Sequence, residues 1–210
     1  MRFAGGIRAM GLAILAGTLA LGTAVPAGAV GYTDGYKFLE AVKKQDLTEV
    51  TKFLTKPGNT IAKSADATTG DTALHIVTRA RSVPWINLMV QAGADVNARN
   101  VAGQTPLQIA ASANFIEGVE VLLYHKARVD ETDQSGETPL IGAVHSHNLP
   151  LVRMLLEGGA DPDRPDNSGR SARDYAKLDT QNGASMLAAL ATAKAKGGQT
   201  PGKPVYGPSL

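Results

Sequence analysis

The chain has 210 residues, with 21 Lys and Arg, 19 Asp and Glu, and no Cys. The absence of cysteine excludes disulfides, thiolate metal sites, a cysteine nucleophile and a lipid-modified N-terminal cysteine. Residues 1–29 carry Arg2 and Arg8 and no acid, so the remaining chain is formally neutral, which argues against a dedicated nucleic-acid binder.

The first predicted element is a secretory signal peptide over residues 1–29. Two arginines precede an uncharged run over residues 9–25, and Ala27-Gly28-Ala29 supplies the small residues that a signal peptidase reads. We expect cleavage after Ala29. The alternatives are an uncleaved anchor helix, for which the glycine-interrupted run is short, and a mitochondrial presequence, which would be more amphipathic and rich in arginine. No second apolar run of spanning length follows, so we expect an exported protein, periplasmic or secreted, without a membrane span after cleavage.

An internal repeat of 33 residues organises the body of the chain. Four glycines recur at this interval: Gly70, Gly103, Gly136 and Gly169. A hydroxyl residue follows each glycine two positions later, at Thr72, Thr105, Thr138 and Ser171. A fixed period of this length predicts stacked units, each of which buries its apolar face only against its neighbours.

Each repeat is predicted to contain two short helices. The Thr residues cap the first helices, whose first turns tolerate proline, and we expect these helices over 73–79, 106–113 and 139–146. We expect the second helices over 84–91, 116–124 and 150–157, with apolar residues in stacked columns. Trp85 shares one column with Gly118 and Leu151, so we interpret Trp85 as a core residue beside the space that Gly118 leaves, and not as a binding hot spot.

The two ends of the repeat array differ from its middle. Residues 34–66 form a degenerate N-terminal cap with two amphipathic helical segments. Residues 166–196 form a C-terminal cap, whose second helix over 184–196 is rich in alanine, as the outer face of a stack should be. Residues 197–210 are rich in Gly and Pro without apolar periodicity, and we predict a disordered tail.

The repeat motif resembles the ankyrin-repeat family, and the signal peptide suggests an exported bacterial type. The matching segments are Gly70-Asp71-Thr72-Ala73-Leu74-His75, Gly103-Gln104-Thr105-Pro106-Leu107-Gln108 and Gly136-Glu137-Thr138-Pro139-Leu140-Ile141. The resemblance implies an all-α solenoid of stacked helix-turn-helix units with hairpin loops, about three full repeats (67–99, 100–132 and 133–165) between two degenerate caps. It also implies that His75, the only retained family histidine, bonds the turn backbone between repeats.

The sequence carries no motif for catalysis, phosphate binding or a metal. His145 and His147 are two residues apart and point to different helix faces, so we interpret them as a surface residue and a turn residue and not as metal ligands. The acidic segments 130–133 and 161–166 lack the full ligand pattern of a calcium loop, and we interpret both as solvated loops. We therefore expect no catalytic residue, no cofactor and no metal.

The family resemblance implies that a ligand meets the hairpin tips and the exposed positions of each first helix. Carried over by position, the candidate partner-binding residues are Thr69, Asp71, Arg79, Arg99, Gln104, Ser112, Thr132, Gln134, Glu137, His145 and Arg170. Each could equally be an ordinary solvated polar residue. The set is mixed in charge and poor in aromatic residues, which favours a polar interface of moderate affinity.

These observations predict a non-catalytic interaction module or scaffold that binds an unidentified exported protein. We expect it to be a monomer and to bind no nucleic acid. The alternative is a secreted effector or immunity-type factor that acts on a protein of a host or a competitor. An enzyme would require a cleft with a nucleophile, a base and an orienting group, which cannot be assembled from this sequence.

Overall fold

The computed structural model describes residues 33–56 and 60–196, with no side-chain description for 193–196. The predicted signal peptide, its cleavage after Ala29 and the predicted tail lie outside these residues. The described part contains ten α-helices and one short 3-10 helix, η1. They are α1 (Asp34–Lys43), α2 (Leu47–Leu54), η1 (Ile61–Lys63), α3 (Ala73–Arg79), α4 (Val83–Gln91), α5 (Pro106–Ser112), α6 (Ile116–Tyr124), α7 (Pro139–His145), α8 (Leu149–Glu157), α9 (Ala172–Leu178) and α10 (Gly183–Lys196).

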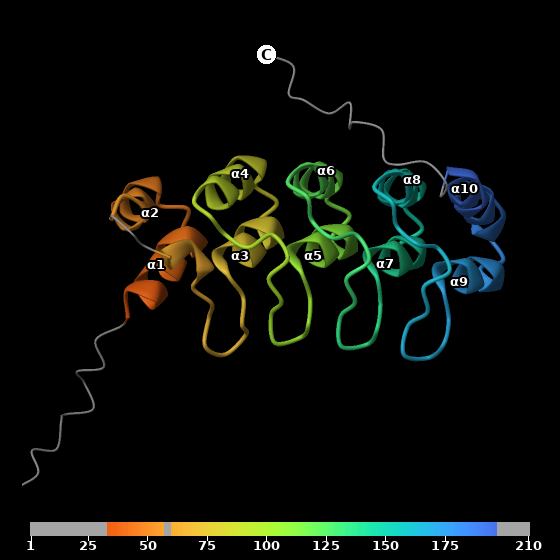
Figure 1. Ribbon diagram of the computed structural model, residues 1–210, viewed down its shortest axis with the longest axis horizontal. Helices are drawn as coiled ribbons and strands as arrows, with labels where there is room; N and C mark the ends of the chain where they lie inside the picture. The colour runs from red at the N-terminus through yellow and green to blue at the C-terminus, as the bar shows by residue number, and fades with distance from the viewer. Residues whose placement is uncertain (1–32, 57–59, 197–210) are drawn as a thin grey trace, which may run out of the picture. The chain divides into compact units, whose positions relative to one another are not determined.

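The helices stack in two rows, as Figure 1 shows for the coloured part of the chain. The odd-numbered helices α1 to α9 form one row and the even-numbered helices α2 to α10 form the other, and hairpin loops project beyond the odd-numbered row. In the repeats, each helix packs against its own partner and against the equivalent helix of a neighbouring unit, as α5 does against α6, α3 and α7. The fold is the predicted all-α solenoid of helix-turn-helix units.

The predicted helices of the repeats agree with the structure to within one residue at each end. The predicted caps at the start of the first helices form, because the hydroxyls of Thr105, Thr138 and Ser171 each accept from a backbone N–H that has no partner within the helix. Thr105 Oγ1 accepts from the N–H of Gln108 (3.3 Å), while Gln108 Oε1 accepts from the N–H of Thr105 (2.8 Å), which is a complete capping box. The second helices α4 and α8 begin one residue earlier than predicted, with the prolines inside the first turn.

The turn between the two helices of a unit uses one residue with a positive φ. This residue is Gln45, Arg81, Asn114 or His147, with φ between 51° and 54°. The interpretation of His147 as a turn residue is therefore confirmed.

A continuous apolar core runs between the two rows, with Leu74, Leu107 and Leu140 fully buried at equivalent positions. Trp85 packs against this core but is only half-buried. The prediction of free space beside Gly118 is wrong. A Cβ on Gly118 would clash with the ring of the buried residue Phe115. The aromatic side chain that precedes α6 therefore fills the volume that residue 118 leaves.

Within residues 33–56 and 60–196, no helix combines the length and the apolar character needed to cross a membrane.

Candidate functional site

Backbone hydrogen bonds join the tips of the hairpin loops in series. The N–H of Val101 donates to the carbonyl of Thr69 (2.9 Å), and the N–H of Gln134 donates to the carbonyl of Ala102 (3.2 Å). The N–H of Asn167 repeats this contact to Ser135 (3.1 Å). Each loop tip is thus held in register by its predecessor, which makes the row of tips one connected surface.

The repeated glycines permit this close contact. Gly70, Gly103 and Gly136 have φ between 69° and 78°, and a Cβ on Gly136 would lie 2.6 Å from the backbone N of Asn167. Gly169 shares the positive φ (80°), yet a Cβ there would meet nothing within 4 Å, because no further hairpin follows among the described residues. The positive φ favours glycine at all four positions, but close packing requires it only at the first three.

A second set of bonds links the first helices to the following hairpin. His75 Nδ1 accepts from the N–H of Thr72 (3.1 Å), and His75 Nε2 lies 3.0 Å from the carbonyl of Gln104. This contact confirms the expected structural role of His75, whose burial lowers its pKa. In the next repeat the amide of Gln108 makes the same pair of contacts, to Thr105 N and to the carbonyl of Glu137 (both 2.8 Å).

Most of the candidate partner-binding residues reach solvent. Seven are exposed: Thr69, Arg79, Arg99, Ser112, Gln134, His145 and Arg170. Three are half-buried: Gln104, Thr132 and Glu137.

Asp71 is the exception, since it is only 6% exposed. Its carboxylate accepts from Asn100 Nδ2 (2.9 Å) and pairs with Arg79. Little of Asp71 can reach a ligand, and its contacts instead hold the hairpin of the next repeat.

The structure brings some candidates together and leaves others apart. Arg99 donates to the carbonyl of Thr132 and to the carboxylate of Glu131, which joins two adjacent loops. At the C-terminal end, His145 lies 3.9 Å from Glu137. The remaining candidates are distributed along the stack, so the arrangement is an extended surface and not a pocket.

Two family models match this part of the chain. A model described as ankyrin repeats (3 copies) matches residues 38–133, and one described as ankyrin repeats (many copies) matches residues 116–176. Residues 38–176 belong to the ankyrin-repeat family. A comparison with curated proteins gives no match. Ankyrin repeats commonly mediate protein–protein interactions, and they do so generally without catalysis.

The ankyrin surface includes an aromatic residue that the sequence reasoning did not select. Tyr175 is half-buried on α9, its hydroxyl donates to Asp166 Oδ2 (2.6 Å), and its ring contacts that of His145 edge to face, with 4.4 Å between centroids. The Arg170 guanidinium lies 5.9 Å from the same ring. The 33-residue period places Tyr175 in line with Ile76, Ile109 and Gly142 of the preceding first helices, and because none of these is a polar surface residue the period did not select it.

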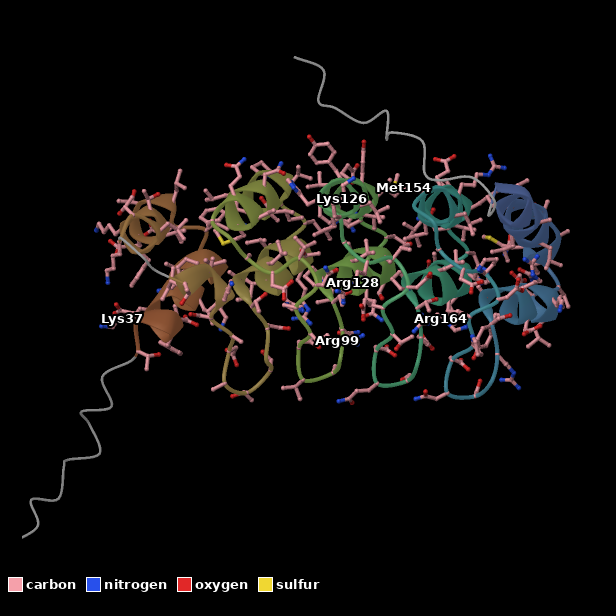
Figure 2. The ribbon with its side chains drawn as sticks, in the orientation of Figure 1. Lys37, Arg99, Lys126, Arg128, Met154 and Arg164 are labelled. Atoms are coloured by element: carbon pink, nitrogen blue, oxygen red, sulfur yellow. The ribbon has the colours of Figure 1, made fainter. Side chains whose placement is uncertain are left out.

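The loops between ankyrin repeats carry charge without forming a metal site. Arg99 and Arg128 both donate to Glu131, and they lie with Arg164 on three consecutive loops (Figure 2). Burial raises the pKa of Glu131, but the two arginines outweigh it and the net shift is downward. Asp130, half-buried beside them, has its pKa raised by burial. No group of three His, Cys, Asp or Glu side chains in the described part of the chain is arranged to hold a metal ion.

Proposed function

We propose that this chain is a non-catalytic ankyrin module that acts after export and binds another exported protein through its hairpin tips and the exposed face of its first helices. The observation that carries the proposal is the register of the exposed residues. Exposed side chains recur at equivalent positions on loops that are bonded to one another through the carbonyls of Thr69, Ala102 and Ser135, so the surface is formed before a partner binds. A pre-organised surface loses little entropy on binding.

The chemistry of this surface favours a polar partner. The tips carry hydroxyl and amide groups, from Thr69 to Ser135, and the few charges on the candidate surface are of both signs. Tyr175 at the C-terminal end is the aromatic side chain best placed to anchor a contact. Polar surfaces with few aromatic anchors bind with moderate affinity.

The proposed export rests on residues 1–29, whose charged start, apolar middle and small-residue end match a signal peptide. Expression of the whole chain in a bacterial host tests this directly. Amino-terminal sequencing of the protein from the periplasm or the medium should begin at Val30. Full-length protein that retains Met1 in the cytoplasm would contradict the export proposal and leave the binding proposal untouched.

A charge-exchange variant tests the binding surface. Glu137→Lys combined with Arg170→Glu changes two candidates without altering net charge. The matched control, Glu117→Lys with Arg153→Glu, makes the same exchange at exposed positions of the even-numbered row. We expect a protein that co-purifies with the tagged wild type to be retained by the control and lost from the surface variant, with both variants folded by circular dichroism. Equal retention by both variants would show that the mapped surface is wrong.

A further inference from the structure

The row of first helices lacks one side chain on the side of the candidate surface. Ile76, Ile109, Gly142 and Tyr175 occupy the same position, 33 residues apart, on α3, α5, α7 and α9. Gly142 lies half-buried in the middle of α7. A Cβ at this position would meet one atom within 4 Å besides its own helix backbone and chain neighbours, Ser112 Oγ at 3.8 Å. A gap in the side-chain layer therefore lies over Gly142, between α5 and α9.

The hydroxyl groups on either side of this gap have already donated their hydrogens. Ser112 Oγ donates to the carbonyl of Gln108 (2.8 Å), and the Tyr175 hydroxyl donates to Asp166 Oδ2 (2.6 Å). A polar side chain placed in the gap would give up hydrogen bonds to water and regain few of them from these groups. An aliphatic side chain has no hydrogen bonds to lose and gains from its burial. The gap therefore favours an aliphatic occupant.

Tyr175 is held in position before a ligand binds. Its ring contacts the His145 ring edge to face, with 4.4 Å between centroids, and the Arg170 guanidinium lies 5.9 Å from the ring centroid. The hydrogen bond to Asp166 fixes the far end of the side chain. A ring constrained in this way loses little freedom when a ligand packs against it, which is typical of an anchor residue in an interface.

Glu137 places a negative charge at the hairpin end of α7. Its side chain is 37% exposed, and no N–H or O–H among the described residues donates to its carboxylate. His145 Nδ1 lies 3.9 Å away. Arg170 occupies the equivalent position on the next hairpin, over the Tyr175 ring. A positive charge on a ligand is therefore favoured beside Glu137 and disfavoured beside Arg170.

We propose that the gap over Gly142 takes one aliphatic side chain, a leucine, isoleucine or methionine, from an extended segment of the partner protein, and that a lysine or arginine close to it in the segment pairs with Glu137. The inference rests on the proposed function, because it assigns a partner chemistry to the surface already proposed to bind. The aliphatic side chain continues the row of Ile76 and Ile109 and packs towards Tyr175. The space is that of one missing side chain, which suits an aliphatic group better than an indole.

Selection from a library of random peptides displayed on phage tests this chemistry. The full chain is the bait, and the library is first depleted on the empty support. We expect the recovered peptides to share a leucine, isoleucine or methionine within two positions of a lysine or arginine. Recovery of peptides that share another chemistry, or of no peptide that binds the chain, would overturn the proposal.

Calorimetry with one recovered peptide then measures each contact. Gly142→Leu fills the gap from within and should weaken binding about tenfold or more, because the aliphatic side chain of the peptide can no longer be buried there. Glu137→Gln should weaken binding about two- to fivefold, as expected for an exposed ion pair. Equal affinity of the wild type and Gly142→Leu for the peptide would overturn the assignment of the gap.

Gly142→Leu is expected to fold, because residue 142 lies in a helix without a positive φ and its Cβ meets no close atom. Its midpoint in urea should not fall below that of the wild type, since leucine favours a helix interior more than glycine does. The matched control, Arg153→Leu, adds an exposed leucine on α8 in the even-numbered row and should bind the peptide as the wild type does.

The same variant separates this inference from the proposed function. A co-purifying protein that is lost from the charge-exchange variant should also be lost from Gly142→Leu. If Gly142→Leu retains that protein, the assignment of the gap is wrong and the binding surface stands.

Discussion

At the scale of single residues, two different side chains perform one structural task. His75 and Gln108 each accept from the N–H of the preceding threonine and reach the hairpin of the next repeat. Both groups combine an acceptor and a donor at similar spacing, provided that the histidine is neutral with its proton on Nε2. Protonation of His75 would set a second N–H against that of Thr72, in a buried site that already disfavours charge.

The burial of His75 predicts a stability that depends on pH. Because burial lowers the pKa of His75, this residue contributes stability that is present above the usual histidine pKa and is lost as the pH falls. We expect the wild type to have a lower free energy of unfolding at pH 5 than at pH 7.5, as measured by urea unfolding. The His75→Gln variant should fold and show a smaller difference between the two pH values. His75→Ala should cost about 1–3 kcal/mol at pH 7.5, because it leaves Thr72 N and the Gln104 carbonyl unpaired. A wild type no less stable at pH 5, or a His75→Gln variant with an unchanged pH profile, would contradict this.

At the scale of the elements, each hairpin combines hydrogen bonds within its own turn, such as that from the N–H of Gly70 to the carbonyl of Asp66, with a bond to the neighbouring hairpin. Thr69, Ala102 and Ser135 each receive a backbone N–H from the next hairpin. Asp71 is likewise secured by Asn100, from the following repeat. The last hairpin, around Gly169, has no such successor among the described residues.

Two glycine substitutions separate backbone strain from hairpin packing. Gly136→Ala and Gly169→Ala both place an alanine in a left-handed backbone conformation, which costs about 1–2 kcal/mol each. Gly136→Ala also forces a Cβ against Asn167, which should add about 1–3 kcal/mol, while Gly169→Ala meets open space. Urea melts of the two variants should therefore differ clearly. Equal losses would mean that contact between hairpins contributes little to stability.

At the scale of the whole stack, stability is a sum of units and the interfaces between neighbours. Leu122 is fully buried in α6, in the middle of the array, and Leu190 is fully buried in α10, at its end. Loss of an interior contact weakens interfaces on both sides, whereas loss of a terminal contact weakens only one. Local opening is therefore expected to begin at the ends.

The position in the stack should decide how far a core truncation is felt. We expect Leu122→Ala to cost about 2–5 kcal/mol in urea unfolding and to lower hydrogen-exchange protection throughout α3 to α8. Leu190→Ala should lower protection mainly in α9 and α10. Leu178→Ala, at a position that is 64% exposed, is the control and should change little. Identical exchange profiles for Leu122→Ala and Leu190→Ala would show that the array unfolds as one cooperative block.

The sequence by itself determined the helices and the turns, because these depend on interactions within a few residues, and its 33-residue period predicted the ankyrin architecture. Thr105 and Gln108 form their cap over three positions, and the period of Gly70 and its equivalents is visible without any structure. Most of the candidate surface followed from the same period, and its role in binding stays a prediction.

Only the tertiary structure decided the contacts between side chains of different units or different helices. It buried Asp71 against Asn100 and set His147 beside Asp179. The partners Asp71 and Asn100, like His147 and Asp179, are about 30 residues apart in the chain, so no local pattern records them. Their distances follow from how one unit rests on the next, and that packing exists only in the folded stack.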